Sequence, residues 1–458
     1  MKSNISALVV FCIFGLIIAV ADLYTLPVYL TVLPIQYLFF RYAVSLKNFP
    51  LLIMEAIWLL SIGIGSTTFF LNRAEAKPVG FRAIGNFDFS YEVFFSVYFF
   101  FVLFQIAVLA ISKYMMKSTD RHAVLDFSKE EIMNFSRMNN NSSIFPLFIF
   151  VVCFSIISIW MYGYHIGMIG LQQTRLPFHL TGILFYCRKF FFTAFLLYLF
   201  LKTENKVVGA ILLFLYAFII SVTGTSKSLC IMVLIPTAFL CYVNGFKKTM
   251  IFVIFGFILI YGFVSETRVI VYNLDASVDV IDLFSSGFDV FFDDFNIGDF
   301  LITFVDGFCE RLYGMQTAVL TNQYTKIALP DLFDFYTLSA TAVDLVPDFT
   351  KTLFGIELPD DMAFGVGVGF TGTFTLLTNH SLFAAIVQAV IIGIIFGLQN
   401  RFYQNIMYSN KRILKYIVLG LILFGLMGFN DGHTMLSLYE STLLIYITNK
   451  FFVKAHKK

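Results

Sequence analysis

Runs of about 20 consecutive apolar residues recur along the chain, and a helix of that length crosses the roughly 30 Å hydrocarbon layer of a bilayer. Hydrophobic residues make up 59% of the 458 residues, and charged residues make up only 13%. This balance excludes a water-soluble domain of the same length. No small-residue cleavage site follows the first run, so we expect it to be retained as a membrane anchor. We therefore expect an all-α polytopic membrane protein.

The apolar runs predict about twelve transmembrane helices. They cover residues 5–22, 26–46, 50–71, 91–112, 144–164, 179–201, 207–223, 228–245, 249–265, 381–398, 413–429 and 434–449. Some, such as the run that contains Phe99, Phe100 and Phe101, are apolar on all sides. This pattern favours contact with lipid and argues against the alternation of a transmembrane β-barrel.

Lys and Arg are concentrated in alternate connections between these runs. The basic stretches lie near 113–137, 202–206, 247–248 and 401–412 and in the tail at 454–458. Cytoplasmic connections carry the excess of Lys and Arg in membrane proteins, so both termini are expected in the cytoplasm. The connections near 72–90, 165–178, 224–227, 266–380 and 430–433 then face outward. The first of these is an exception to the rule, because it carries Arg73, Lys77 and Arg82.

The chain is predicted to have three parts. Residues 1–265 carry transmembrane helices 1 to 9, residues 266–380 form a large acidic loop on the outer face, and residues 381–458 carry helices 10 to 12 and a basic cytoplasmic tail. The loop holds 17 Asp and Glu against 4 Lys and Arg. Its short amphipathic stretches, rich in Phe, predict a partly helical, ordered segment and not a disordered acidic tail.

Two arginines in the acidic loop are candidates for binding an anionic group. Arg268 follows the outer end of the ninth run, where lipid head groups lie, and Arg311 lies further along the loop. A guanidinium stays protonated and its planar fork of donors suits a diphosphate. The alternative is that both only neutralise nearby carboxylates, such as Glu266 and Glu310.

Three further cations are candidates for the same kind of site. Arg188 lies near mid-depth in the sixth run, where a charge faces either a polar cavity or an ion-pair partner such as Glu55 or Glu440. Arg175 lies in a short outer loop without an acidic neighbour, and Lys227 lies in the turn at 224–228. A loop cation at head-group level can bind phosphate or sugar, although many are only solvated.

His380, at the end of the acidic loop, is the first candidate for a general base, because imidazole can accept a hydroxyl proton near neutral pH. The alternative is that His380 is only an interfacial anchor. Asp431 with His433 is a second choice. The chain shows no metal-ligand spacing, no P-loop and no dinucleotide fingerprint, so we expect neither a metal nor a cofactor, and an ATP-driven transporter is disfavoured.

Several of these features together resemble a known family. They are Arg175 in an outer loop, a Gly-Thr-Ser-Lys-Ser turn at 224–228, a large outer loop late in the chain, and a glycine-rich approach at 365–372 that leads to Asn379 and His380 and then to Gly393 and Gly397. This arrangement resembles the Wzy-type O-antigen polymerases. Lys227 stands where the family often has arginine, and no proline or acidic residue lies within the glycine-rich approach.

The resemblance implies a multi-span (GT-C-like), metal-independent glycosyltransferase of the bacterial inner membrane. Its substrate would be an oligosaccharide repeat unit on undecaprenyl diphosphate, joined to others at the periplasmic face, with a possible chain-length regulator as partner and no nucleic acid. The departing diphosphate would be stabilised first by Arg175, Arg268 and Arg311 and then by Lys227 and Arg188. The general base would be His380 or else Glu266.

Two other classes stay open. An O-antigen ligase would share the donor chemistry and differ in its acceptor. A lipid-linked oligosaccharide flippase or secondary transporter would also have about twelve helices and buried charges. Such transporters usually show internal repeats, and the two halves of this chain show no convincing similarity.

Overall fold

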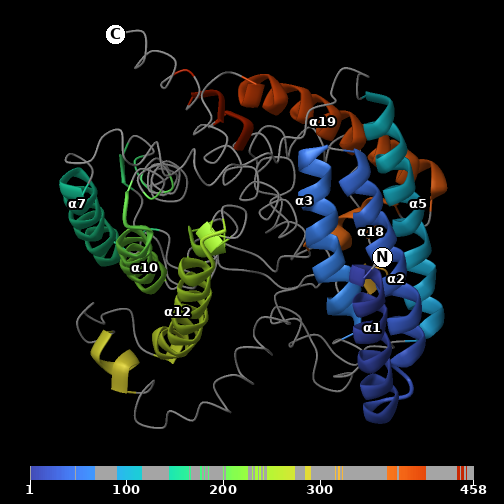
Figure 1. Ribbon diagram of the computed structural model, residues 1–458, viewed down its shortest axis with the longest axis horizontal. Coiled ribbons are helices and arrows are strands. Elements are labelled where there is room, and N and C mark those ends of the chain that lie inside the picture. Colours follow the sequence, from blue (N-terminus) through green and yellow to red (C-terminus); the bar gives the residue numbers. More distant parts are fainter. Residues whose placement is uncertain are drawn as a thin grey trace.

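The computed structural model describes residues 2–46, 48–67, 90–115, 144–164, 203–224, 245–273, 284–289, 369–378 and 381–408, with short pieces and single positions between 166 and 241, 315 and 322, and 441 and 450. Every regular element in these ranges is a helix (Figure 1). Among the described residues, five stretches are long and apolar enough to cross a membrane: Pro50–Thr67, Tyr91–Met115, Lys206–Thr223, Lys247–Val264 and Leu382–Tyr403. Each matches a predicted run. The described chain therefore has the architecture of a helical membrane protein.

The helices form two groups (Figure 1). The larger group contains α1 (Lys2–Ala21), α2 (Leu26–Leu46), α3 (Phe49–Trp58), the π-helix η1 (Leu59–Ile64) that continues α3, α5 (Tyr91–Met115), α18 (Gly369–Thr378) and α19 (Leu382–Tyr408). The smaller group contains α7 (Ile144–Gly163), α10 (Lys206–Thr223) and α12 (Lys247–Asn273). Helices that are far apart in the sequence thus pack together in each group.

Polar side chains cap the first turns of four helices, where backbone N–H groups have no helical partner. Asn48 accepts from the backbone N–H of Leu51 at the start of α3, and Asn205 caps α10 in the same way. Ser90 and Ser381 accept from the third residue after them, at the starts of α5 and α19. The sequence signals for these helix starts are therefore local.

α1 and α2 form an antiparallel hairpin. The Asp22 carboxylate accepts from the backbone N–H of Tyr24 at 3.0 Å and from the Thr25 hydroxyl at 2.8 Å, which fixes the short turn between them. Further along, the Tyr29 hydroxyl donates to the Phe11 carbonyl at 2.8 Å, and the two rings stack. The apolar stretch before Asp22 is therefore a separate helix that runs opposite to α2.

α2, α5 and α19 run in the same direction. Along α2 and α5, the contacts proceed in step from Tyr24 with Tyr91, through Gln36 with Gln105, to Tyr42 with Lys113. Along α5 and α19, Ser112 donates to the Gly393 carbonyl, and Arg401 donates to the Met115 carbonyl. The predicted order of crossings requires this shared direction, and it brings the C-terminal ends of the three helices to one side of the bundle.

α19 approaches α5 closely because two of its contact residues are glycines. A methyl group at Gly393 would lie 2.9 Å from Cβ of Ile111, and one at Gly397 would lie 2.6 Å from Cβ of Met115. The spacing is a Gly-x-x-x-Gly motif, which lets the backbones of two membrane helices come into contact. The contact between α5 and α19 therefore depends on the absence of side chains at both positions.

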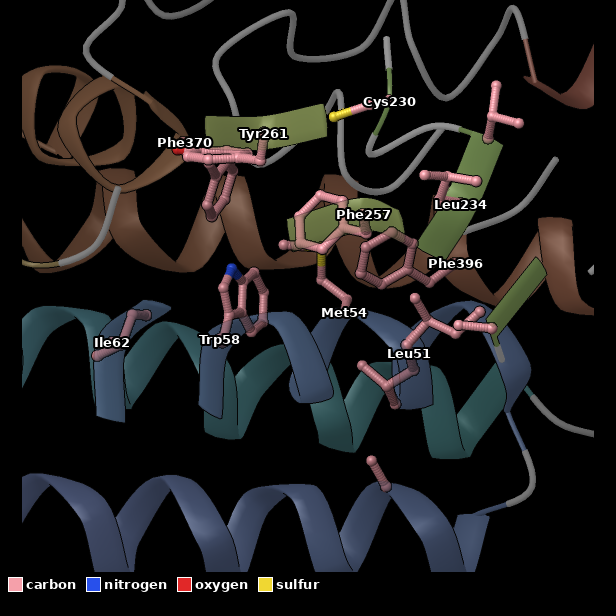
Figure 2. Close-up of a cluster of buried hydrophobic side chains, with 14 of the residues drawn as sticks. Leu51, Met54, Trp58, Ile62, Cys230, Leu234, Phe257, Tyr261, Phe370 and Phe396 are labelled. Atoms are coloured by element: carbon pink, nitrogen blue, oxygen red, sulfur yellow. The ribbon is translucent and has the colours of Figure 1, made fainter. Parts of the chain in front are cut away.

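A buried apolar cluster joins the two groups of helices. The larger group contributes Met54 and Trp58 of α3, Phe370 of α18 and Phe396 of α19, and the smaller group contributes Phe257 and Tyr261 of α12, with Cys230 and Leu234 in the same cluster (Figure 2). Trp58 stacks on Phe370 at 5.7 Å between ring centroids and meets Phe101 and Phe104 of α5 edge-on. α18 therefore lies inside the protein, although it closes the acidic loop in sequence.

Cysteine labelling would test the crossing of α2 and α5 and their orientation. Leu23 lies in the turn before α2 and is 70% exposed, and Tyr114 lies at the other end of α5 and is 87% exposed. In a chain without its native cysteines, we expect Leu23→Cys to react with an impermeant maleimide in intact spheroplasts and Tyr114→Cys to react only after permeabilisation. The reverse pattern would invert the orientation, and labelling of both before permeabilisation would contradict a crossing.

Candidate functional site

Two of the seven residues singled out from the sequence have a described backbone position. Glu266 and Arg268 lie on α12, near its C-terminal end. The other five, Arg175, Arg188, Lys227, Arg311 and His380, lie outside the described residues. Their proximity to one another therefore stays a prediction.

α12 continues as a helix past the membrane-crossing stretch Lys247–Val264 to Asn273. At 1.5 Å per residue, Glu266 lies about 3 Å and Arg268 about 6 Å beyond the end of that stretch along the helix axis. The head-group layer on each side of a bilayer is about 5 to 8 Å thick. Arg268 thus lies on a rigid element at the depth of lipid phosphates if α12 crosses the membrane upright.

Glu266 and Arg268 are positioned on different sides of α12. Two residues along a helix correspond to a rotation of about 200°, so these positions are not neighbours on its surface. Thr267 lies between them and is fully buried, and its methyl group faces Gly287 of the helical turn at 284–289.

Residues 284–289 are a described part of the acidic loop, and they pack against the helices. Phe288 of this turn packs against Phe218 of α10 and Phe263 of α12, with ring centroids 6.3 and 5.0 Å apart. Phe284 also lies against Phe218. The turn covers the face of α12 that carries Thr267. The backbone positions of Glu266 and Arg268 lie on either side of this covered face.

The glycine-rich approach leads into α18, which starts at Gly369 and is buried at 370–375, 377 and 378. Gln388 of α19 donates to the Thr378 hydroxyl at 3.0 Å, which ties the end of α18 to α19. His380 falls between the last residue of α18 and Ser381, the cap of α19. The chain on each side of His380 is therefore held by two packed helices.

A buried polar cluster lies inside the larger group of helices, where the sequence predicted no site. It consists of Gln36 on α2, Glu55 on α3, and Tyr98 and Gln105 on α5. The two glutamine amides pair reciprocally, at 2.8 and 3.0 Å. The second N–H of Gln36 reaches the Tyr98 hydroxyl at 3.3 Å, and the second N–H of Gln105 reaches Oε2 of Glu55 at 3.1 Å. All four amide hydrogens are thus used.

Glu55 is the ionisable member of this cluster and is fully buried within Pro50–Thr67. Its Oε2 accepts from Gln105, and its Oε1 has no hydrogen-bond partner in the described part of the chain. A charged carboxylate at the centre of a membrane helix costs about 3 kcal/mol or more. Carboxyl groups at such positions commonly mark ion, proton or substrate pathways.

The helix distorts next to Glu55. Residues Leu59–Ile64 form the π-helix η1, whose wider turn is rare and frequently lies at functional sites. Gly63 in this turn packs on α2 close to Gln36. Trp58 Nε1 and the Ser61 hydroxyl are also buried without a hydrogen-bond partner among the described residues, and the indole nitrogen points toward Phe370 (Figure 2). The π-helix η1 thus follows Glu55 on the same helix and lies close to Gln36 through Gly63.

The sequence held a signal for this cluster. Gln36, Glu55 and Gln105 each interrupt an apolar run, and polar side chains inside membrane helices usually face other helices. Sequence reasoning considered Glu55 only as a partner for Arg188. The structure gives Glu55 a neutral partner, Gln105, and Arg188 lies outside the described residues.

Comparisons of the chain with protein-family models, with curated proteins and with solved structures find no match. Within the described ranges, no three His, Cys, Asp or Glu side chains are grouped so that they could hold a metal ion.

Proposed function

We propose that the chain is a multi-span, GT-C-like glycosyltransferase with about twelve transmembrane helices. It would polymerise undecaprenyl-diphosphate-linked oligosaccharide repeat units into O-antigen or a related surface polysaccharide, at the periplasmic face of the inner membrane. The observation that supports this most is the continuation of α12 beyond its apolar stretch, which carries Arg268 about 6 Å further along the helix axis. A diphosphate anchored to a membrane lipid lies at this level.

The proposed reaction exchanges one bond to the anomeric carbon of the donor sugar. The acceptor hydroxyl oxygen forms a bond to that carbon, and the bond from the carbon to the diphosphate oxygen breaks. The diphosphate leaves with the electron pair, so negative charge develops on it in the transition state. Fixed cations lower the energy of that charge without a metal. The first candidates proposed for this role are Arg175, Arg268 and Arg311, and the second candidates are Lys227 and Arg188.

The proton of the acceptor hydroxyl goes to a general base. His380 is proposed for this role, and Glu266 is the alternative. The junction between α18 and α19 supports His380, because a base must be held within hydrogen-bond reach of the hydroxyl and both neighbouring helices are packed. Glu266 lies on the same helix as Arg268, about 3 Å nearer the membrane.

A lipid-linked oligosaccharide flippase or secondary transporter is the second candidate, because of the Glu55 cluster. A carboxyl group buried in the membrane and next to a π-helix is typical of proteins that couple ion or proton movement to a conformational change. A glycosyltransferase has no evident need for such a group at mid-depth. The cluster therefore favours this class over an O-antigen ligase as the runner-up.

Complementation of a deletion strain would test the polymerase. We expect the strain without the protein to attach one repeat unit to the lipopolysaccharide core, and the wild-type chain to restore the long-chain ladder. Arg268→Lys should leave mostly single repeats, because a point charge loses the two-pronged contact to the diphosphate. Loss of a charged hydrogen bond predicts roughly 10- to 100-fold slower polymerisation.

Arg41→Lys is a matched control, because Arg41 is an exposed arginine of α2. It should give the wild-type ladder at equal protein level. A normal ladder from Arg268→Lys would remove Arg268 from the site. A deletion strain without any repeat on the core would instead point to a ligase or a flippase.

A further inference from the structure

We propose that Glu55 is a proton-binding site inside the membrane, where Oε1 takes up and releases a proton while Oε2 stays bonded to Gln105. This goes beyond the proposed polymerase and does not depend on it. The ligand is a proton, because the Glu55 carboxyl is fully buried among packed helices. The proposal rests on the hydrogen bonds of the cluster, on its depth and on the neighbouring π-helix.

The hydrogen bonds around Glu55 suit a neutral carboxylic acid. A buried carboxylate needs a cation or several donors to replace its hydration. Glu55 receives one N–H, from Gln105, and the other three amide hydrogens of the two glutamines are committed elsewhere in the cluster. Oε1 is therefore the oxygen that can carry a proton without displacing an existing hydrogen bond.

No described cation pairs with Glu55. Tyr98 is the titratable side chain that faces the cluster from α5, and its hydroxyl lies 3.5 Å from the Val32 carbonyl of α2. The charged side chains described on α2, α5 and α19 are Arg41, Glu92, Lys113 and Arg401, and α18 carries none. Lys113 lies beside the ring of Tyr42 and Arg401 donates to the end of α5, about 12 Å or more from Gln105 along that helix.

The π-helix η1 is the element whose conformation can change when Glu55 gains or loses its proton. η1 follows Glu55 on the same helix, and its Gly63 packs on α2 close to Gln36, the other end of the glutamine pair. Loss of the proton leaves a charge for which the cluster has no further donor, so that Glu55 must find water or a cation. A wider helical turn beside it is the element that can adjust. Protonation of Glu55 would thereby be linked to the position of α3.

Infrared spectroscopy of the purified full-length chain in lipid nanodiscs would test this. At neutral pH, exposed Asp and Glu are ionised, whereas a protonated carboxyl group absorbs at a distinctly higher frequency than a carboxylate. We expect such a band in the wild type, its shift on transfer to D2O, and its loss in Glu55→Gln, which keeps the size of the side chain. Glu92→Gln, a change at an exposed glutamate of α5, should keep the band.

Each other outcome would overturn the proposal. Absence of the band from the wild type would show an ionised Glu55 or one paired with a cation. A band that survives in Glu55→Gln would belong to another group, and a band that does not shift in D2O would show a carboxyl closed to proton exchange. If Glu55→Gln fails to fold, carboxyl-13C glutamate in the wild type still shows whether a glutamate carries the band. The readout is independent of polymer synthesis, so failure of this proposal and failure of the proposed function are separate results.

Discussion

His380→Ala is expected to slow polymer formation by roughly 10²- to 10⁴-fold, the usual effect of losing a general base. The reason is that the acceptor hydroxyl is a poor nucleophile until a base takes its proton. The measurement is the turnover of purified protein supplied with lipid-linked repeat units, at equal amounts of folded protein. The same reaction should continue in excess EDTA, because the proposed mechanism uses arginines in place of a metal.

His456→Ala, a change in the C-terminal tail, is the matched control and should turn over normally. If His380 is only an interfacial anchor, its substitution should lower stability while the surviving protein keeps full activity. That result would move the base to Glu266 or Asp431. Loss of activity in EDTA with recovery on adding a divalent ion would refute the metal-free mechanism.

Gly397→Leu should destabilise the protein by roughly 3 kcal/mol, near the upper end for overpacked cores. Even a methyl group at this position would lie 2.6 Å from Cβ of Met115, so a leucine must push α19 away from α5. The expected result is a lower temperature for loss of the monodisperse peak in size-exclusion chromatography after heating in detergent. Gly393→Leu should behave similarly, because Ile111 occupies the corresponding position.

Gly163→Leu provides the comparison for this experiment. Gly163 ends α7, and a methyl group there would meet no atom within 4 Å. The Gly163→Leu variant should lose its monodisperse peak at a temperature close to that of the wild type. Equal melting of Gly397→Leu and the wild type would mean that α5 and α19 do not touch at these glycines.

The positions of the five described stretches that can cross a membrane were predictable, because a bilayer requires about 20 apolar residues for each crossing. The run at 26–46 is α2 (Leu26–Leu46), and the run at 91–112 is extended only slightly in α5 (Tyr91–Met115). The faces of the helices were not predictable, since lipid and neighbouring helices both favour apolar side chains. Phe99 and Phe101 were both expected to face lipid, yet Phe99 is 58% exposed and Phe101 is buried against Trp58.

Of the candidate site, the structure describes only the part that follows the ninth apolar run. Arg268 lies on α12, four residues past the apolar stretch Lys247–Val264, and its role in binding stays a prediction. The continuation of this helix to Asn273 was not expected from the acidic loop. The Glu55 cluster depends on contacts between residues 50 to 69 positions apart, such as Gln105 with Glu55 and with Gln36. Nothing local in the sequence specifies that register. From the sequence, Gln36, Glu55 and Gln105 could only be recognised as exceptions within apolar runs.

The packing of α5 on α19 also constrains how the chain is made. Ser112 and Gly393 are 281 positions apart, and Met115 and Arg401 are 286 apart. At 5 to 20 residues per second, α5 leaves the ribosome roughly 15 to 60 s before its partner helix exists. During that time its Ile111 and Met115 surface must be covered by lipid or by a chaperone. In a truncated chain that stops before Gly393, this surface of α5 would stay without its partner helix. We expect quality-control proteases to degrade such a chain.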